Sequence, residues 1–277
     1  MYDLAVVYRI YPGVTKEPII HSNDKLKLSK LAIKSFRKSL GSLNAKIWIL
    51  LDNCGEEYKE IFMSNLKEYD LEFINLNGVG NYKTFNMQIE ILLKQNYSEF
   101  VYFAEDDYIF LPNALEKSLK FMKENDFVDF LSVYDAYDLY NLDFHNYKSK
   151  IITYGDLHWR TSSCTTLSFM TRKTALSKTK WIFDTYSKYD NFDSSIWMSL
   201  TKNNLFDFRS VYRFFYSADR DFIRILKSWL YCWRQIVFGK KYSLWTPIPS
   251  LGTHLDNAGI APSINWSNVI NEIDIKN

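Results

Sequence analysis

The first 112 residues alternate between short apolar runs and longer segments with apolar residues at helical spacing. Apolar runs of this kind are typical of strands that are buried on both faces. They are Leu4–Ile10, Lys46–Leu51, Leu71–Leu76 and Phe100–Ala104. The helical patterns are Asp24–Leu40, Glu56–Tyr69, Thr84–Gln95 and Pro112–Asn125. The alternation predicts an α/β fold with a mostly parallel central sheet that is flanked by helices.

The rest of the chain follows a different pattern. Strands are predicted at Asp129–Tyr134 and Cys164–Thr171, with a polar loop, Asp135–Arg160, between them. A basic, tryptophan-rich helix is predicted within Asp219–Trp245, and the tail after Pro262 is predicted to be irregular. We find no repeat and no Pro/Gly-rich linker, so we expect this part to complete the same domain as a smaller mixed region with a C-terminal helical segment.

Composition excludes several classes of protein. The net charge of +2 gives no global field for nucleic acid. Three widely spaced cysteines indicate neither a disulfide framework nor a zinc cluster, which favours a reducing compartment. We see no signal-peptide pattern and no apolar run long enough to span a bilayer, so a cytoplasmic location is expected. Aromatic residues make up 17% of the chain and are expected mostly in the core.

Three adjacent carboxylates, Glu105-Asp106-Asp107, directly follow the fourth predicted strand. Such charges repel one another, and burying them is costly unless a cation neutralises them. Carboxylate oxygens suit Mg²⁺ or Mn²⁺, which are often shared with substrate phosphates. Ligands of open α/β sheets bind at the carboxyl ends of the strands, where these residues are expected. The alternative is an acidic turn that caps the helix after Pro112.

A second candidate lies in the turn Asn77–Lys83, which contains two glycines and precedes a predicted helix. Backbone N–H groups at a helix start favour a phosphate group. The turn has the spacing of neither a P-loop nor a dinucleotide fingerprint. Lys83 is either a diphosphate ligand or a solvated lysine.

The order of these parts resembles a family-2-type glycosyltransferase with the GT-A fold. Four segments carry the resemblance, and they are Val7–Pro12, the strand that ends in Asp52, the DXD-like Glu105–Asp107, and Phe192-Asp193-Ser-Ser-Ile-Trp197. The last is similar to the family's Glu-Asp-x-x-x-Trp pattern, although Phe192 replaces the usual glutamate. His254, in Pro249–His254, is similar to a histidine that completes the metal site in some GT-A enzymes.

The resemblance implies roles for particular residues. Asp193 would be the catalytic base, with Asp190 as its rival; we interpret Asp190 as the N-cap of the helix that contains Asp193. Asp107 and His254 would hold Mn²⁺ or Mg²⁺. The donor would be bound by the remaining candidates, which are Arg9, Tyr11, Asp52, Asn81, Lys83, Glu105 and Asp106. Within a single domain of residues 1–277, the nucleotide-sugar would bind to 1–112 and the acceptor to 113–218, while 219–277 would form the basic aromatic helix and tail.

The sequence therefore predicts a metal-dependent, inverting glycosyltransferase of surface polysaccharide biosynthesis. It would move a sugar from a nucleotide-sugar donor to a glycan or lipid-linked saccharide acceptor. A nucleotidyltransferase acting on sugar phosphates and a non-catalytic carbohydrate-binding protein are the alternatives. Trp159 either stacks on an acceptor sugar or lies in the core. The basic aromatic helix either contacts the inner face of the plasma membrane or packs within the protein or at a dimer contact.

Overall fold

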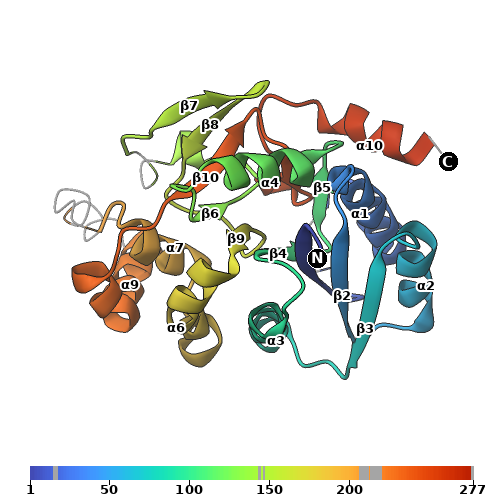
Figure 1. Cartoon of the computed structure of the whole chain (residues 1–277), viewed down its shortest axis with the longest axis horizontal. Coiled ribbons are helices and arrows are strands. Elements are labelled where there is room, and N and C mark those ends of the chain that lie inside the picture. The colour runs from blue at the N-terminus through green and yellow to red at the C-terminus, as the bar shows by residue number, and fades with distance from the viewer. Residues whose placement is uncertain (15–17, 143–144, 146, 206–211, 213–219, 276–277) are drawn as a thin grey trace.

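We describe a computed structural model of the chain, which covers residues 1–14, 18–142, 145, 147–205, 212 and 220–275 (Figure 1). Its helices are α1 (Lys25–Leu40), α2 (Glu56–Asn65), α3 (Asn81–Lys94), α4 (Ala114–Glu124), α5 (Asp138–Asn141), α6 (Lys173–Tyr189), α7 (Asp193–Thr201), α9 (Arg220–Phe238), α10 (Trp266–Ile275) and the 3₁₀-helix η2 (Asn257–Gly259). No helix of these ranges is long and apolar enough to cross a membrane.

Within the described ranges, nine strands form one sheet in the order β3-β2-β1-β4-β9-β6-β10-β8-β7. They are β1 (Leu4–Ile10), β2 (Ala45–Asp52), β3 (Asp70–Leu76), β4 (Phe100–Glu105), β6 (Phe130–Leu131), β7 (Ile151–Tyr154), β8 (Leu157–Thr161), β9 (Met170–Arg172) and β10 (Leu244–Ile248). Strands β1 to β4 are parallel to one another, β9 is antiparallel to both β4 and β6, and beyond it β10 is parallel to β6 and antiparallel to β8. The predicted α/β class is confirmed, with a sheet that is parallel at its core and mixed beyond it.

The strand order reverses at the contact between β1 and β4. The chain runs outward from β1 to β2 and β3, and then returns to the other side of β1 as β4. Arg9 lies opposite Glu105 in this parallel pair. Such a reversal leaves a crevice outside the carboxyl ends of the two strands, which is the usual ligand site of open α/β sheets.

Strand β1 is buried on both faces because each face packs against a separate layer of helices. Leu4, Val6 and Tyr8 belong to a core with residues of α1, α2 and α4, whereas Ala5 and Val7 pack with residues of α3, α6 and α7. Alternate side chains of a strand point to opposite faces, so a continuous apolar run is what this position requires. Figure 1 shows α1 and α2 on one side of the parallel strands and α3 on the other.

A small second sheet pairs β5 (Tyr108–Phe110) antiparallel with β11 (Gly252–His254). In this register His254 lies opposite Tyr108, and the backbone N–H of Leu255 donates to the carbonyl oxygen of Asp107 at 2.8 Å. The sequence did not predict either strand. This pairing brings a C-terminal histidine to the residue that ends the acid triplet.

Several predicted elements of the second half are corrected by the structure. The predicted loop Asp135–Arg160 contains the β7–β8 hairpin, which turns at Gly155 with φ +63°. The predicted strand Cys164–Thr171 shrinks to β9, because serine and threonine hydroxyls before it bond to nearby groups in place of a ladder, as Ser162 Oγ does to the Cys164 carbonyl at 2.7 Å. Asp129–Tyr134 is likewise reduced to the two residues of β6.

The C-terminal part of the chain is also more regular than predicted. The tail after Pro262 forms α10, where Trp266, Ile270 and Ile273 are buried at helical spacing against the core on the α1 side. The segment between α9 and α10 contributes β10 to the main sheet, between β6 and β8.

Trp159 lies in the core, so the interpretation in which it stacks on a sugar is wrong. Its side chain is 1% exposed, and its ring stacks on Phe121 with centroids 4.1 Å apart and planes at 9°. Trp159 lies on β8, on the face of the sheet that packs against α4, the helix that contains Phe121.

We expect Trp159→Ala to lower the free energy of unfolding by about 3–5 kcal/mol, because the substitution removes a buried aromatic ring and leaves a cavity. Urea unfolding followed by circular dichroism measures this change. Trp181→Ala is the matched control, since Trp181 is 43% exposed on α6 and its loss should cost less than about 0.5 kcal/mol. Equal losses in the two variants would contradict the core assignment.

Candidate active site

A cavity of about 550 Å³ opens at the carboxyl ends of β1, β2 and β4. It lies at the strand-order reversal, and the starts of α3 and α7 also contribute to its wall. Nine of the eleven predicted site residues line it, namely Arg9, Tyr11, Asp52, Asn81, Glu105, Asp106, Asp107, Asp193 and His254. Lys83 and Asp190 do not. The fold therefore gathers side chains from six separate parts of the chain around one space.

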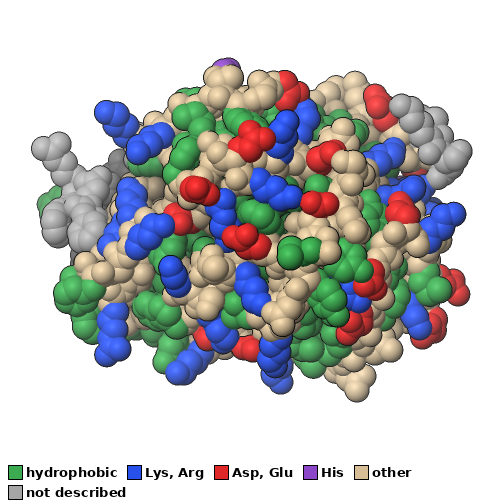
Figure 2. Space-filling view, viewed as in Figure 1, with side chains coloured by type: hydrophobic (Ala, Val, Ile, Leu, Met, Phe, Trp, Pro, Cys, Tyr) green, Lys and Arg blue, Asp and Glu red, His purple; other side chains and the backbone are tan. Residues whose placement is uncertain are grey.

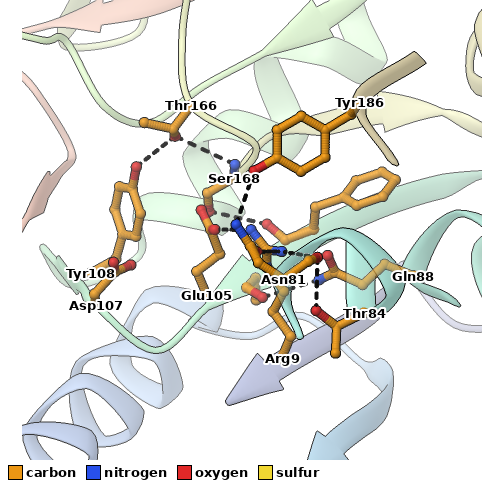
Figure 3. Close-up of polar contacts among 12 residues, drawn as sticks. Arg9, Asn81, Thr84, Gln88, Glu105, Asp107, Tyr108, Thr166, Ser168 and Tyr186 are labelled. Carbon is orange, nitrogen blue, oxygen red and sulfur yellow. Dashed lines mark hydrogen bonds and ion pairs between the residues drawn. The ribbon is translucent and has the colours of Figure 1, made fainter. Parts of the chain in front are cut away.

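Arg9 and Glu105 form the buried ion pair at the base of this cavity. Arg9 Nη2 donates to Glu105 Oε1, and Arg9 Nη1 donates to the side-chain oxygen of Asn81 and, at 3.2 Å, to its backbone carbonyl. Figure 3 shows the Arg9 side chain between the other two residues. Burial raises the pKa of the Glu105 carboxyl, and the Arg9 guanidinium opposes this effect. Arg9 thus joins β1, α3 and β4 through charge-assisted hydrogen bonds.

Asp106 has a cation of its own in Lys25, at the start of α1. Lys25 Nζ lies 2.7 Å from Asp106 Oδ2, and the Tyr11 backbone N–H donates to the same oxygen at 3.3 Å. Burial raises the pKa of Asp106, while Lys25 works in the opposite direction. Two members of the acid triplet are therefore paired with the chain's own cations.

Asp107 faces His254, with 2.9 Å between Oδ2 and Nε2. The Asp256 backbone N–H donates to His254 Nδ1 at 3.1 Å, and the imidazole packs edge-on against the Tyr108 ring. Because Nδ1 accepts a hydrogen bond, the neutral ring carries its proton on Nε2 and donates it to Asp107. The pairing of β5 with β11 sets this contact, and His254 is the one histidine among the described residues that line the cavity.

Asp52 lines the cavity, and both of its oxygens hold the neighbouring turn. They accept the backbone N–H groups of Val79 at 2.8 Å and Gly80 at 2.9 Å. Gly80 has φ +83°, a left-handed conformation that glycine adopts at little cost. The predicted phosphate-binding turn therefore gives two of its N–H groups to Asp52. What remains directed at the cavity is the first turn of α3, which begins at Asn81 and not at Thr84 as predicted.

Asp193 is the first residue of α7, and its side chain lines the cavity. Its Oδ1 accepts the backbone N–H of Ser194 at 2.6 Å, which fixes the carboxylate at the helix start. The helix dipole favours an ionised carboxylate at this position. The prediction of a helix with Asp193 in its first turn is confirmed.

Asp190 is not the N-cap of α7, so that prediction is wrong. It ends α6 in a left-handed conformation with φ +51°, which aspartate tolerates better than most residues, and Phe192 occupies the N-cap position. Its Oδ1 accepts from the Tyr82 hydroxyl outside the cavity. Lys83 is exposed on α3 and points away, because Asn81 and Thr84, three residues apart, face the cavity instead.

Lys25 and Tyr186 line the cavity, but the sequence analysis did not predict them as site residues. Lys25 directly follows the capping Asp24 at the start of α1. Tyr186 on α6 accepts a hydrogen bond from Asn81 Nδ2 at 2.9 Å, and burial raises its pKa to about 12. Nothing in the local sequence marks Tyr186, since only the packing of α6 on α3 brings it to the site.

No protein-family model and no curated protein matches this sequence. Solved glycosyltransferases are among the structures that the chain resembles, as the motifs predicted. Staphylococcus aureus TarS 1–349 in complex with UDP-GlcNAc is similar with a TM-score of 0.44 and 16% identity, over 64% of this chain and 47% of that one. The chain thus spans about half the length of the TarS chain.

Two further solved structures are similar over different shares of the chain. The galactosyltransferase LgtC, in complex with donor and acceptor sugar analogues, has a TM-score of 0.48 and 12% identity, over 97% of this chain and 94% of that one. A cytidylyltransferase from Leptospira borgpetersenii has a TM-score of 0.37 and 8% identity, over 65% and 64%. Glycosyltransferases and a cytidylyltransferase are therefore both among the similar structures.

We expect Arg9→Met to lower the free energy of unfolding by about 3–5 kcal/mol, because it leaves the Glu105 carboxylate buried without its partner. The double variant Arg9→Met/Glu105→Leu should recover much of this loss, since no buried charge remains. Urea unfolding of the wild type, both single variants and the double variant measures the coupling. Additive losses, with a coupling below about 0.5 kcal/mol, would show that the pair does not hold the two strands together.

Proposed function

We propose that this chain is a metal-dependent, inverting glycosyltransferase that moves a sugar from a nucleotide-sugar donor to a saccharide acceptor. One observation carries the proposal. The Asp107–His254 pair, which suits a divalent cation, and Asp193, a carboxylate held at a helix start, line the same cavity. A metal-dependent, inverting transfer from a nucleotide-sugar uses both kinds of group, one at the leaving diphosphate and one at the acceptor hydroxyl.

Asp107 and His254 fit a Mn²⁺ or Mg²⁺ ion by their chemistry. A carboxylate oxygen and an imidazole nitrogen already lie 2.9 Å apart at the wall of the cavity. Among the described residues no group of three His, Cys, Asp or Glu side chains is arranged to hold a metal, so substrate oxygens would supply the remaining ligands. A bound divalent cation supplies charge stabilisation for the leaving diphosphate. Ligation through Nε2 requires its proton to leave, and the Asp256 contact at Nδ1 then has to open.

The donor would lie across the carboxyl ends of β1, β2 and β4. The first turn of α3 contributes the positive end of a helix dipole, which favours the diphosphate. Tyr11 is exposed and lines the cavity, so its ring is available for a nucleotide base to stack on. Asp106 offers its carboxylate to hydroxyl groups of the ribose or the donor sugar. Arg9 and Lys25 act by keeping the acidic floor close to neutral, so that an anionic substrate is tolerated.

Asp193 would take the proton of the acceptor hydroxyl as that oxygen attacks the anomeric carbon. Its hydrogen bond from Ser194 N–H and the dipole of α7 both favour the charged form that a base needs. Attack by the acceptor on the face opposite to the leaving diphosphate inverts the anomeric configuration. A glycan or a lipid-linked saccharide of surface polysaccharide biosynthesis would be the acceptor, in the cytoplasm or at its membrane boundary.

Binding of a nucleoside diphosphate should raise the melting temperature only when Mn²⁺ is present. A ligand at about one hundred times its Kd stabilises the folded state by roughly 2.7 kcal/mol, which corresponds to a shift of about 5–10 °C in a domain of this size. Differential scanning fluorimetry with UDP, GDP and CDP, with Mn²⁺ or with EDTA, measures the effect. Asp107→Asn and His254→Ala should lose it, whereas Asp156→Asn, an exposed carboxylate outside the cavity, should keep it. An equal shift in EDTA would contradict the metal assignment.

Asp193→Asn should lower kcat by about 10²–10⁴-fold and leave the metal-dependent thermal shift intact, because it removes the base and not the donor site. Release of nucleoside diphosphate from the donor identified by the thermal shifts measures turnover. Asp190→Asn serves as the matched control, since this carboxylate lies three residues away and outside the cavity, and it should retain activity. NMR of the product should show inversion at the anomeric carbon, and retained configuration would remove the need for Asp193 as a base.

A further inference from the structure

Helix α9 carries an apolar stripe on its outer side. The stripe consists of the exposed residues Ile223, Leu226, Leu230, Trp233 and Val237, which recur at intervals of three and four. The backbone of α9 is kinked at Cys232, with φ -124° and ψ 16°. The spacing therefore places Ile223, Leu226 and Leu230 along one face before the kink and Trp233 and Val237 along one face after it. Leu230 is 62% exposed and Trp233 47% exposed, and Phe238 extends the apolar surface at the helix end. Hydrophobic side chains gather at the edge of the molecule where α9 lies, with basic side chains beside them (Figure 2).

The opposite face of α9 is already used for packing within the protein. Ile225 and Ile236 are buried in a cluster with Met198 of α7, and Trp229 packs against the same cluster. Ser228 Oγ donates to the Ser195 carbonyl of α7 at 3.0 Å. The apolar stripe is therefore not the face that fixes the helix to the fold. The two tryptophans of α9 lie on different faces, because Trp229 packs against the inner cluster whereas Trp233 is exposed.

The charges around the apolar stripe are basic. None of the described side chains from Phe222 to Phe238 is acidic. The guanidinium of Arg234 lies over the Trp233 ring, 5.6 Å from its centroid, and Lys240 and Lys241 follow exposed at the helix end. Lys227 and Lys240 contact Asp190 and Asp129, so Arg234 and Lys241 are the cations that no carboxylate of the described residues neutralises.

We propose that the apolar stripe of α9 docks on the surface of a bilayer that contains anionic lipids. An amphipathic helix with aromatic and aliphatic residues on one face and basic residues beside it lies in the plane of such an interface. The lipid phosphates complement the basic side chains, and the acyl boundary receives the apolar stripe. A second copy of the helix fits less well, because the described side chains from Phe222 to Phe238 offer no carboxylate to pair with its cations.

Docking would place the candidate active site at the membrane. Helix α7, which begins at Asp193, packs directly on α9, and Ser195 Oγ donates to the Arg224 carbonyl at 2.7 Å. The acceptor side of the cavity is thereby tied to the docking helix. A lipid-linked saccharide would then approach Asp193 from the bilayer. This last step rests on the proposed function, whereas docking itself does not.

Vesicle flotation tests the docking surface without reference to activity. The whole chain should float with vesicles of equal parts phosphatidylcholine and phosphatidylglycerol, and much less with phosphatidylcholine alone or at high salt. The double variant Leu230→Ser/Trp233→Ser should reduce the bound fraction roughly tenfold. The control Met63→Ser/Trp181→Ser removes an aliphatic and an aromatic side chain of similar exposure, 53% and 43%, from other helices and should float as the wild type does. Circular dichroism and urea unfolding check that both variants are folded.

Three outcomes would overturn the proposal. One is equal flotation of the Leu230→Ser/Trp233→Ser variant and the wild type. Another is the absence of wild-type binding to the anionic vesicles. The third is a dimer in analytical ultracentrifugation that the double variant converts to a monomer, with no vesicle binding in either protein, because the stripe would then be an interface between two copies. None of these outcomes bears on the metal-dependent thermal shift or on turnover, so the two proposals fail separately.

Discussion

The site depends on how the fold accommodates three adjacent, partly buried carboxylates at the tip of β4. Each faces a positive or hydrogen-bonding partner from a different part of the chain, with Arg9 on β1, Lys25 on α1 and His254 on β11. Unpaired, such charges would be costly to bury, so the folded state has to provide a partner for each of them. Each partner depends on a different feature of the fold. The β1–β4 register places Arg9 opposite Glu105, the start of α1 provides Lys25, and the pairing of β11 with β5 provides His254.

The three pairs are not equivalent. Arg9 cannot lose its proton, and separating it from Glu105 would leave two charges in a site where they are only 9% and 17% exposed. His254 can give up its proton, and the side chain of Asp107 is 30% exposed, the most open of the triplet. An incoming divalent cation would therefore replace a proton at the Asp107–His254 pair at lower cost than it would replace Arg9 or Lys25. This ranking favours Asp107 over Glu105 and Asp106 as the metal ligand.

The sequence predicts what is local and fails where a contact comes from far along the chain. The apolar runs that became β1, β2 and β4 are buried on both faces, as their sequences predicted, and Asp193 at the start of α7 follows from helix patterning. The same prediction was wrong for β3, which is only partly buried because it lies at the edge of the sheet. Lys25 was not predicted as a site residue, because its partner, Asp106, lies on another element. Asp190 was predicted as an N-cap because aspartate is common at that position. In the structure it instead ends α6 in a left-handed conformation. The β7–β8 hairpin was missed because its strands carry many polar residues.

Aromatic residues show the same division between local pattern and long-range packing. Trp159 and Trp233 are equally suited by chemistry to a sugar or a membrane, and only the fold separates them, since β8 turns the first into the core against Phe121 while α9 leaves the second outside. Spacing could reveal the apolar stripe, but not which face of α9 is buried, because the apolar residues of the inner face also follow helical spacing. Packing against α7 determines which face of α9 is buried, and α7 is also the helix that begins with Asp193. The position of a surface residue and the position of a candidate base are therefore set by the same contact.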